Sequence, residues 1–96
     1  MAHKLIILGG GESGVGAALL GKQQGYDVFV SDGGILKETY KSELQKEGID
    51  FEEGGHTLEK ILQADEVMKS PGIPEKADVM KAIRSKSIEV ISEFEL

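Results

Sequence analysis

The chain has 96 residues, of which 40% are hydrophobic and 29% charged, a composition typical of one small soluble domain with a single core. Its formal net charge of −6 argues against non-specific binding to nucleic acid, which needs a basic surface. Its lack of cysteine excludes a disulfide framework and a thiolate metal site. No apolar run is long enough to span a membrane, and the segment before Lys4 is too short for a secretory signal. We therefore expect a cytoplasmic protein that binds neither nucleic acid nor a membrane.

The first half of the chain alternates strand and helix patterns. Residues 4–8 form an apolar run, as expected of a parallel strand that is covered on both faces. A helix pattern follows the glycines after this run and ends at Gly25, and residues 28–30 form a second apolar strand. A second helix is predicted over about residues 36–47, before Gly48. The inward faces of the two helices are predicted to carry Val15, Ala18, Leu19, Leu36, Tyr40 and Leu44.

The second half continues the alternation with shorter elements. Strands are predicted over residues 49–52, 66–69 and 88–91. Two helices lie between them, with Thr57 and Asp78 as their predicted N-caps. The core residues predicted for these helices are Leu58, Ile61, Leu62, Val79, Ala82 and Ile83.

Five strands alternating with helices predict a single α/β domain over residues 1–96, a Rossmann-like parallel sheet with helices on both faces. Right-handed crossovers favour the strand order 3-2-1-4-5, which reverses direction between strands 1 and 4. Ligands bind such sheets in the crevice beyond the carboxyl ends of the strands at this reversal. We therefore expect the loop after Leu8 to lie beside the loop formed by Ser70, Pro71 and Gly72.

The loop after the first strand contains a G-x-G-x-x-G motif formed by Gly9, Gly11 and Gly14. In this motif the first glycine permits a tight turn, the second lets a diphosphate approach the backbone, and the third allows close helix–strand packing. The motif therefore predicts that the loop holds the diphosphate of a nucleotide. Ser13 either donates its hydroxyl to a phosphate or favours the helix start, and Glu12 is expected to point into solvent.

Asp32 stands at the end of the second strand, eighteen residues after Gly14. A carboxylate at this place commonly accepts hydrogen bonds from the ribose or base of a nucleotide. The alternative is that Asp32 begins a turn with Gly33 and Gly34, a role that also suits its side chain.

The segment Ser70-Pro71-Gly72-Ile73-Pro74 follows a buried strand, and its prolines predict a rigid loop that exposes backbone groups. The alternative is a stiff connector to the next helix. Lys69 either supports a phosphate or is solvated, and His56 is expected only to lead into the next helix. No metal-ligand cluster, P-loop or nucleophile paired with a base is present, so the chain has no predicted catalytic residue and looks like a binding module.

These motifs together resemble the N-terminal domain of the Mur ligases over essentially the whole chain. The residues that carry the resemblance are Ile7-Leu8-Gly9, Gly11, Ser13-Gly14, Val30-Ser31-Asp32, Ala64 to Val67, Ser70-Pro71-Gly72-Ile73 and Val90-Ile91-Ser92-Glu93.

The resemblance implies a ligase of peptidoglycan synthesis that adds D-glutamate to UDP-MurNAc-L-alanine, with ATP and Mg²⁺ as cofactors and an acyl-phosphate intermediate. Its N-terminal domain would hold the UDP end of the substrate. Carried over by position, Gly11, Glu12 and Ser13 would face the diphosphate, and Asp32 with Gly33 would meet the uracil. The UDP-binding residues expected on this basis are Gly9, Gly11, Glu12, Ser13, Gly14, Asp32, Gly33, Ser70, Pro71 and Gly72.

The family's central ATP-binding domain and its C-terminal domain have no counterpart among the 96 residues. We therefore expect one domain of a longer, monomeric ligase that completes its site with those domains, needs no cofactor itself and catalyses nothing alone. Two alternatives remain at this point. One is an NAD(H)-binding module of a dehydrogenase or a transport regulator, and the other is a flavodoxin-like signalling domain without a nucleotide.

Overall fold

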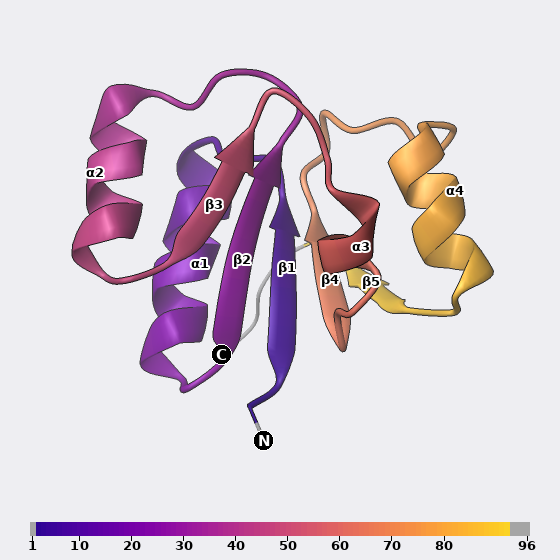
Figure 1. Cartoon of the computed structure of the whole chain (residues 1–96), viewed down its shortest axis with the longest axis horizontal. Helices are drawn as coiled ribbons and strands as arrows, with labels where there is room; N and C mark the ends of the chain where they lie inside the picture. The colour runs from indigo at the N-terminus through magenta and orange to yellow at the C-terminus, as the bar shows by residue number, and fades with distance from the viewer. Residues whose placement is uncertain (1, 93–96) are drawn as a thin grey trace.

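Five parallel strands form the centre of the structure, a computed structural model that describes residues 2–92 (Figure 1). The strands are β1 (Lys4–Leu8), β2 (Asp27–Asp32), β3 (Asp50–Glu53), β4 (Glu66–Lys69) and β5 (Glu89–Ile91). They lie in the order β3-β2-β1-β4-β5. The predicted order, with its reversal between β1 and β4, is therefore confirmed. Glu93, part of the last motif in the family resemblance, lies outside the described residues.

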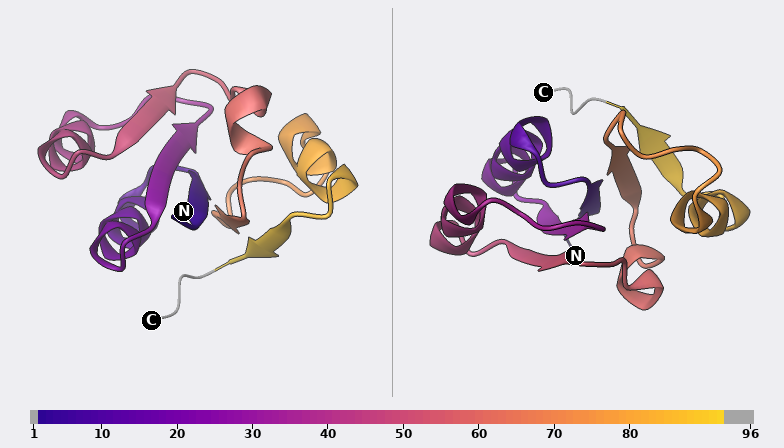
Figure 2. Two further views of the ribbon diagram at one scale, coloured as in Figure 1. Left: turned by 60° about the horizontal axis from the view of Figure 1, so that its bottom comes forward. Right: turned by 90° about the horizontal axis from the view of Figure 1, so that it is seen from above.

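Two helices cover each face of the sheet. These are α1 (Glu12–Gln23) and α2 (Glu38–Lys46) on one face, and α3 (Leu58–Ile61) and α4 (Asp78–Ser85) on the other. Figure 2 shows the sheet between the two pairs when the molecule is seen from above. Within the described part of the chain, no helix has both the length and the apolar character needed to cross a membrane.

The core is divided between the two faces because successive side chains of a strand point to opposite sides. In β1, Leu5 and Ile7 join the cluster under α1 and α2, while Ile6 and Leu8 join the cluster under α3 and α4. All four are buried, as the apolar run predicted. The glycine loop therefore follows a strand that packing fixes from both sides.

The predicted helix stops are confirmed at Gly25 and Gly48, which have φ values of +87° and +71°. Each is the residue after a helix C-cap, where the left-handed conformation favours glycine. Two predicted starts are wrong. Leu36 is buried in the loop before α2 rather than inside the helix, and Asp78 is the first residue of α4, with Ala77 at the N-cap.

The short helices differ from the prediction in which side chains they bury. The helix α3 has only four residues, and it does not turn both of its predicted core residues, Leu58 and Ile61, toward the sheet. Ile61 is fully buried in the core, whereas Leu58 is 40% exposed. In α4, Met80 is buried and Ala82 only half-buried. Thr57 does stand at the N-cap of α3, but its side chain caps no helical N–H and bonds Glu52 instead.

Candidate functional site

The glycine loop turns sharply at Gly9 and packs closely at Gly14. Gly9 has a φ of +101°, and its N–H donates to the Ser31 carbonyl oxygen at 2.9 Å. A Cβ atom at Gly14 would lie only 2.0 Å from the Gly9 carbonyl oxygen. The predicted structural roles of the first and third glycines are therefore confirmed.

The middle glycine of the motif opens onto solvent at the start of α1. Gly11 is the N-cap residue, it is exposed, and a Cβ atom there would meet nothing within 4 Å. No side chain caps the first turn of the helix, whose leading N–H groups lack intrahelical acceptors. These N–H groups can bind an anion. Glu12 and Ser13 are exposed in this turn, and the hydroxyl contact predicted for Ser13 stays a prediction.

Gly10, to which the sequence assigned no role, joins the glycine loop to the end of β2. Its N–H donates to Asp32 Oδ2 at 2.7 Å, and a Cβ atom there would lie 2.1 Å from Leu36 Cδ2. Asp32 Oδ1 also accepts from the Gly34 N–H at 2.8 Å. The turn interpretation of Asp32 is thus confirmed. Its contact with a nucleoside stays a prediction, since each carboxylate oxygen has a second lone pair.

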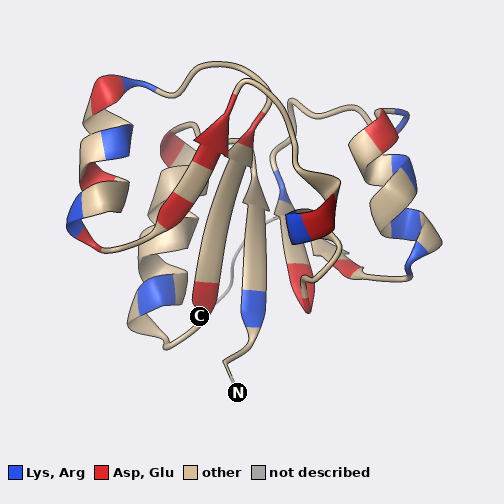
Figure 3. Cartoon of the chain, in the orientation of Figure 1, with Lys and Arg blue, Asp and Glu red and all other residues tan. Residues whose placement is uncertain are grey.

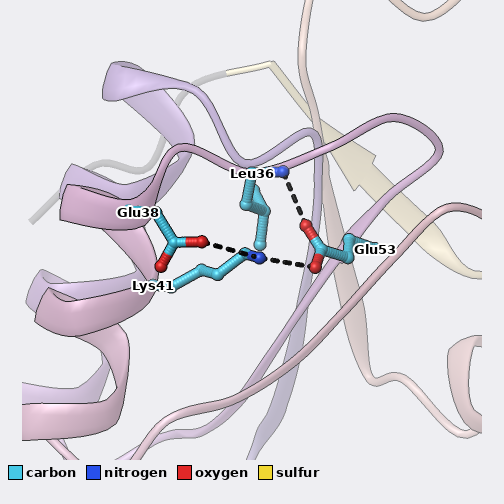
Figure 4. A network of polar contacts seen from close by, with 4 residues as sticks. All are labelled: Leu36, Glu38, Lys41 and Glu53. Atoms are coloured by element: carbon cyan, nitrogen blue, oxygen red, sulfur yellow. Dashed lines mark hydrogen bonds and ion pairs between the residues drawn. The ribbon is translucent and has the colours of Figure 1, made fainter.

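A polar network fixes the segment between β2 and α2 (Figure 4). The Leu36 N–H donates to Glu53 Oε1 at 2.9 Å, and Lys41 Nζ lies 2.6 Å from Glu53 Oε2 and 3.5 Å from Glu38 Oε1. The hydrogen bond from Lys41 is the main cause that lowers the pKa of Glu53, and the same bond raises the pKa of Lys41. Leu36 is thereby held against Gly10 beneath the glycine loop.

The Ser70-Pro71-Gly72 loop lies directly against the glycine loop, as predicted. The Ser70 N–H donates to the Leu8 carbonyl oxygen at 3.0 Å, and a Cβ atom at Gly9 would lie 2.6 Å from Ser70 Cβ. Lys69 Nζ donates to the Ile73 carbonyl oxygen at 2.8 Å, so this lysine ties the loop together instead of being only solvated. Pro71 and Gly72 are exposed beside the crevice.

A cavity of about 480 Å³ lies between these loops and α4, within the size range of small-molecule sites. Its lining residues are Gly9, Asp32, Gly33, His56, Leu58, Gly72, Ile73, Pro74, Ala77, Asp78 and Val79. Four predicted site residues are thus brought together there, namely Gly9, Asp32, Gly33 and Gly72. Glu12 and Ser13 line a different hollow, which lies along α1 and includes Met68 of β4.

His56 is the cavity residue that the sequence reasoning missed. Its Nδ1 lies 2.7 Å from the hydroxyl of buried Ser31, which donates to Glu52 Oε2 at 2.8 Å. A Cβ atom at Gly33 would lie 3.3 Å from His56 Nε2. The expectation that His56 only leads into α3 is therefore wrong. A polar residue just after β3, at the carboxyl edge of the sheet, was the signal that could have found it.

The ionised carboxylate of Glu52 holds the Ser31 hydroxyl that contacts His56. Burial alone would raise the pKa of Glu52, but hydrogen bonds from the Thr57 backbone, the Thr57 hydroxyl and the Ser31 hydroxyl together lower it. An ionised carboxylate only accepts hydrogen bonds, so the Ser31 proton must point at Glu52. Ser31 therefore meets His56 with an oxygen lone pair.

Charge is distributed unevenly around the crevice. Figure 3 shows acidic residues at the carboxyl ends of β2 and β3, where Asp32, Glu52 and Glu53 lie. The positive end of the α1 dipole lies at the glycine loop. An anionic diphosphate is therefore favoured at α1, and an uncharged nucleoside toward β2 and β3. Within residues 2–92, no group of three or more His, Cys, Asp or Glu side chains could hold a metal ion.

The chain is similar to known proteins in both its sequence and its fold. Residues 4–79 match the family described as the MurD N-terminal domain. The chain is 63% identical over 95 residues to the UDP-N-acetylmuramoylalanine–D-glutamate ligase of Cytophaga hutchinsonii, and 53% identical over 95 residues to that of Christiangramia forsetii. Each match covers 99% of this chain and 21% of the relative, so the chain spans about a fifth of their length.

A solved structure shares the fold over nearly the whole chain. The murein peptide ligase of Psychrobacter arcticus superposes with a TM-score of 0.84 at 25% identity. The match covers 95% of this chain and 19% of that protein.

Proposed function

The chain belongs to the family of MurD N-terminal domains, and from this premise we propose that it holds the UDP end of UDP-MurNAc-L-alanine. The observation that carries the proposal is the open N-terminus of α1 at Gly11, next to the cavity between Asp32 and the Ser70-Pro71-Gly72 loop. The diphosphate binds the leading N–H groups of α1. The uridine extends from there into the cavity.

The chemistry of the whole enzyme lies in parts that these residues do not include. The relatives are ligases named for UDP-N-acetylmuramoylalanine and D-glutamate, and this chain spans 21% of their length. The proposed full-length protein is a monomeric cytoplasmic ligase in which ATP and Mg²⁺ bind a further domain. The 96 residues alone contribute substrate binding and catalyse nothing.

A titration of the labelled chain with UDP, UDP-MurNAc-L-alanine and NADH tests the proposal through amide chemical shifts. We expect the two uridine ligands to move the amides of residues 9–14, 32–34 and 70–72, where the loops meet. Shifts produced by NADH alone would overturn the proposal in favour of a dinucleotide-binding module.

Gly11→Val supplies a sharper version of the same test. A Cβ atom at Gly11 meets no protein atom within 4 Å, so the fold should survive the change. The added side chain fills the space that the diphosphate needs, so UDP binding should be lost. UDP binding retained by a folded Gly11→Val variant would show that the loop holds no diphosphate.

A further inference from the structure

Lys69 ends β4 directly before the Ser70-Pro71-Gly72 loop, and its side chain lies on the face of the sheet that α3 and α4 cover. Val67, two residues earlier, packs in the core cluster of that face, and side chains alternate along a strand. The helix α1 covers the opposite face. The lysine therefore lies away from the helix N-terminus at which the diphosphate is proposed to bind.

The ammonium group of Lys69 is used within the loop itself. Its Nζ donates to the Ile73 carbonyl oxygen at 2.8 Å, and within residues 2–92 no other donor bonds this oxygen. The Ile73 N–H in turn donates to the Ser70 carbonyl oxygen at 3.1 Å. Because Lys69 is half-buried, its hydrogen bond is partly shielded from competing water.

A carboxylate near the loop offsets the positive charge of Lys69. The pKa of Glu75 is lowered first by its hydrogen bond from Arg84 and, to a smaller extent, by the charge of Lys69. The ammonium group thus has a hydrogen-bond acceptor and a neighbouring negative charge, both supplied by residues that follow it closely in the chain.

The segment that Lys69 holds forms one wall of the cavity. Gly72, Ile73 and Pro74 are lining residues, whereas Lys69 is not. At the start of the loop, Ser70 is bonded to Leu8. Farther along, the wall is held by the packing of the Ile73 side chain and by the bond from Lys69. The Gly72 N–H adds only a long contact of 3.5 Å to Ser70 Oγ.

We infer that Lys69 is a positioning residue, whose bond to the Ile73 carbonyl holds the loop in the shape that binds the nucleotide without touching the phosphates. This inference rests on the proposed function. Without the bond the loop samples other shapes, and the apparent affinity falls in proportion to the fraction of chains that keep the competent one. The loss is then the same for every nucleotide that uses this wall, whatever its phosphate charge.

The test compares UDP with UMP on the 96-residue chain. Lys69→Met keeps the apolar stem and removes the donor, so we expect both nucleotides to bind about fivefold more weakly, at low salt and at high salt alike. Lys69→Arg restores a donor and should recover most of the affinity. Lys76→Met is the matched control, since it removes the same charge from an exposed lysine nearby in the chain and should leave both affinities unchanged.

Binding is measured at a temperature at which circular dichroism shows Lys69→Met to be folded. Amide hydrogen exchange of the ligand-free chain gives a second readout, since the Ile73 amide should exchange faster in Lys69→Met than in wild type. A loss confined to UDP, or one that grows as salt is lowered, would show a phosphate contact and overturn the inference. Unchanged affinity for both nucleotides would overturn it as well. Wild-type chain that binds neither nucleotide would instead defeat the proposed function, and this inference with it.

Discussion

Gly14→Ala should destabilise the fold by disrupting the contact between α1 and the glycine loop. The new Cβ atom would lie 2.0 Å from the Gly9 carbonyl oxygen, 3.1 Å from its carbonyl carbon and 3.2 Å from Ile7 Cγ2. Because the nearest atoms belong to the backbone, no side-chain rotation relieves the contact. The helix and the loop would have to separate by roughly 1 Å. The adjoining strand β1 resists this movement because its side chains are packed in the core on both faces of the sheet.

The size of the loss follows from two opposing effects. Overpacking costs about 1–3 kcal/mol, and more where the backbone must move. Replacing a helical glycine by alanine returns about 0.5–1 kcal/mol through the unfolded state. We therefore expect a net loss of about 2 kcal/mol, which lowers the midpoint of urea unfolding by about 1 M at the denaturant sensitivity usual for small domains.

Gly16→Ala is the matched control in the same helix. A Cβ atom at Gly16 would meet nothing within 4 Å, so only the favourable effect remains and the midpoint should rise. Both variants are measured by circular dichroism in urea. If Gly14→Ala were as stable as Gly16→Ala, the reasoning from the Gly9–Gly14 contact would be refuted.

Gly10 and Leu36 should behave as a coupled pair, so Gly10→Ala should destabilise the fold far less in a Leu36→Ala background. A double-mutant cycle of urea unfolding should give a coupling free energy of at least about 1 kcal/mol, and additive losses of stability would contradict the contact. The hydrogen bond from Lys41 lowers the pKa of Glu53, so it stabilises the fold above the ordinary value of 4.5 and is lost as pH falls through the lower folded value. Stability measured from pH 7 down to pH 3 should therefore decline less steeply in Glu53→Gln, and parallel curves would argue against this ion pair. Ile61→Ala should cost about 2–5 kcal/mol in thermal unfolding and Leu58→Ala less than about 1 kcal/mol, whereas equal losses would conflict with their different burial.

The sheet could be predicted because each strand leaves a short, regular pattern of apolar residues in the sequence. Buried parallel strands appear as short apolar runs, and right-handed connections leave few orders for five of them. The placement of Gly9 beside Ser70 followed from that order, since both residues come directly after neighbouring strands. The roles of Gly9 and Gly14 could be predicted because only glycine tolerates the required turn and approach.

The rest depended on contacts between distant side chains. The position of Leu36 is set by the space beside Gly10 and by a hydrogen bond to Glu53, not by helix periodicity. His56 reaches the cavity because the Ser31 hydroxyl, 25 residues away, holds its ring. A single-turn helix such as α3 carries too few residues for a reliable inward face, which is why Leu58 was placed wrongly.

The hydrogen bonds among the loops also bear on the thermodynamics of binding. Gly9 is bonded to Ser31, Gly10 to Asp32 and Ser70 to Leu8, so the three segments around the crevice are joined to one another without any ligand. Ordering a mobile side chain on association costs about 0.5–1.5 kcal/mol, and loops add to this. Here the conformational entropy of these loops is already lost when the chain folds, so a ligand would bind a preformed surface. Affinity changes among related ligands should then appear mainly in the dissociation rate.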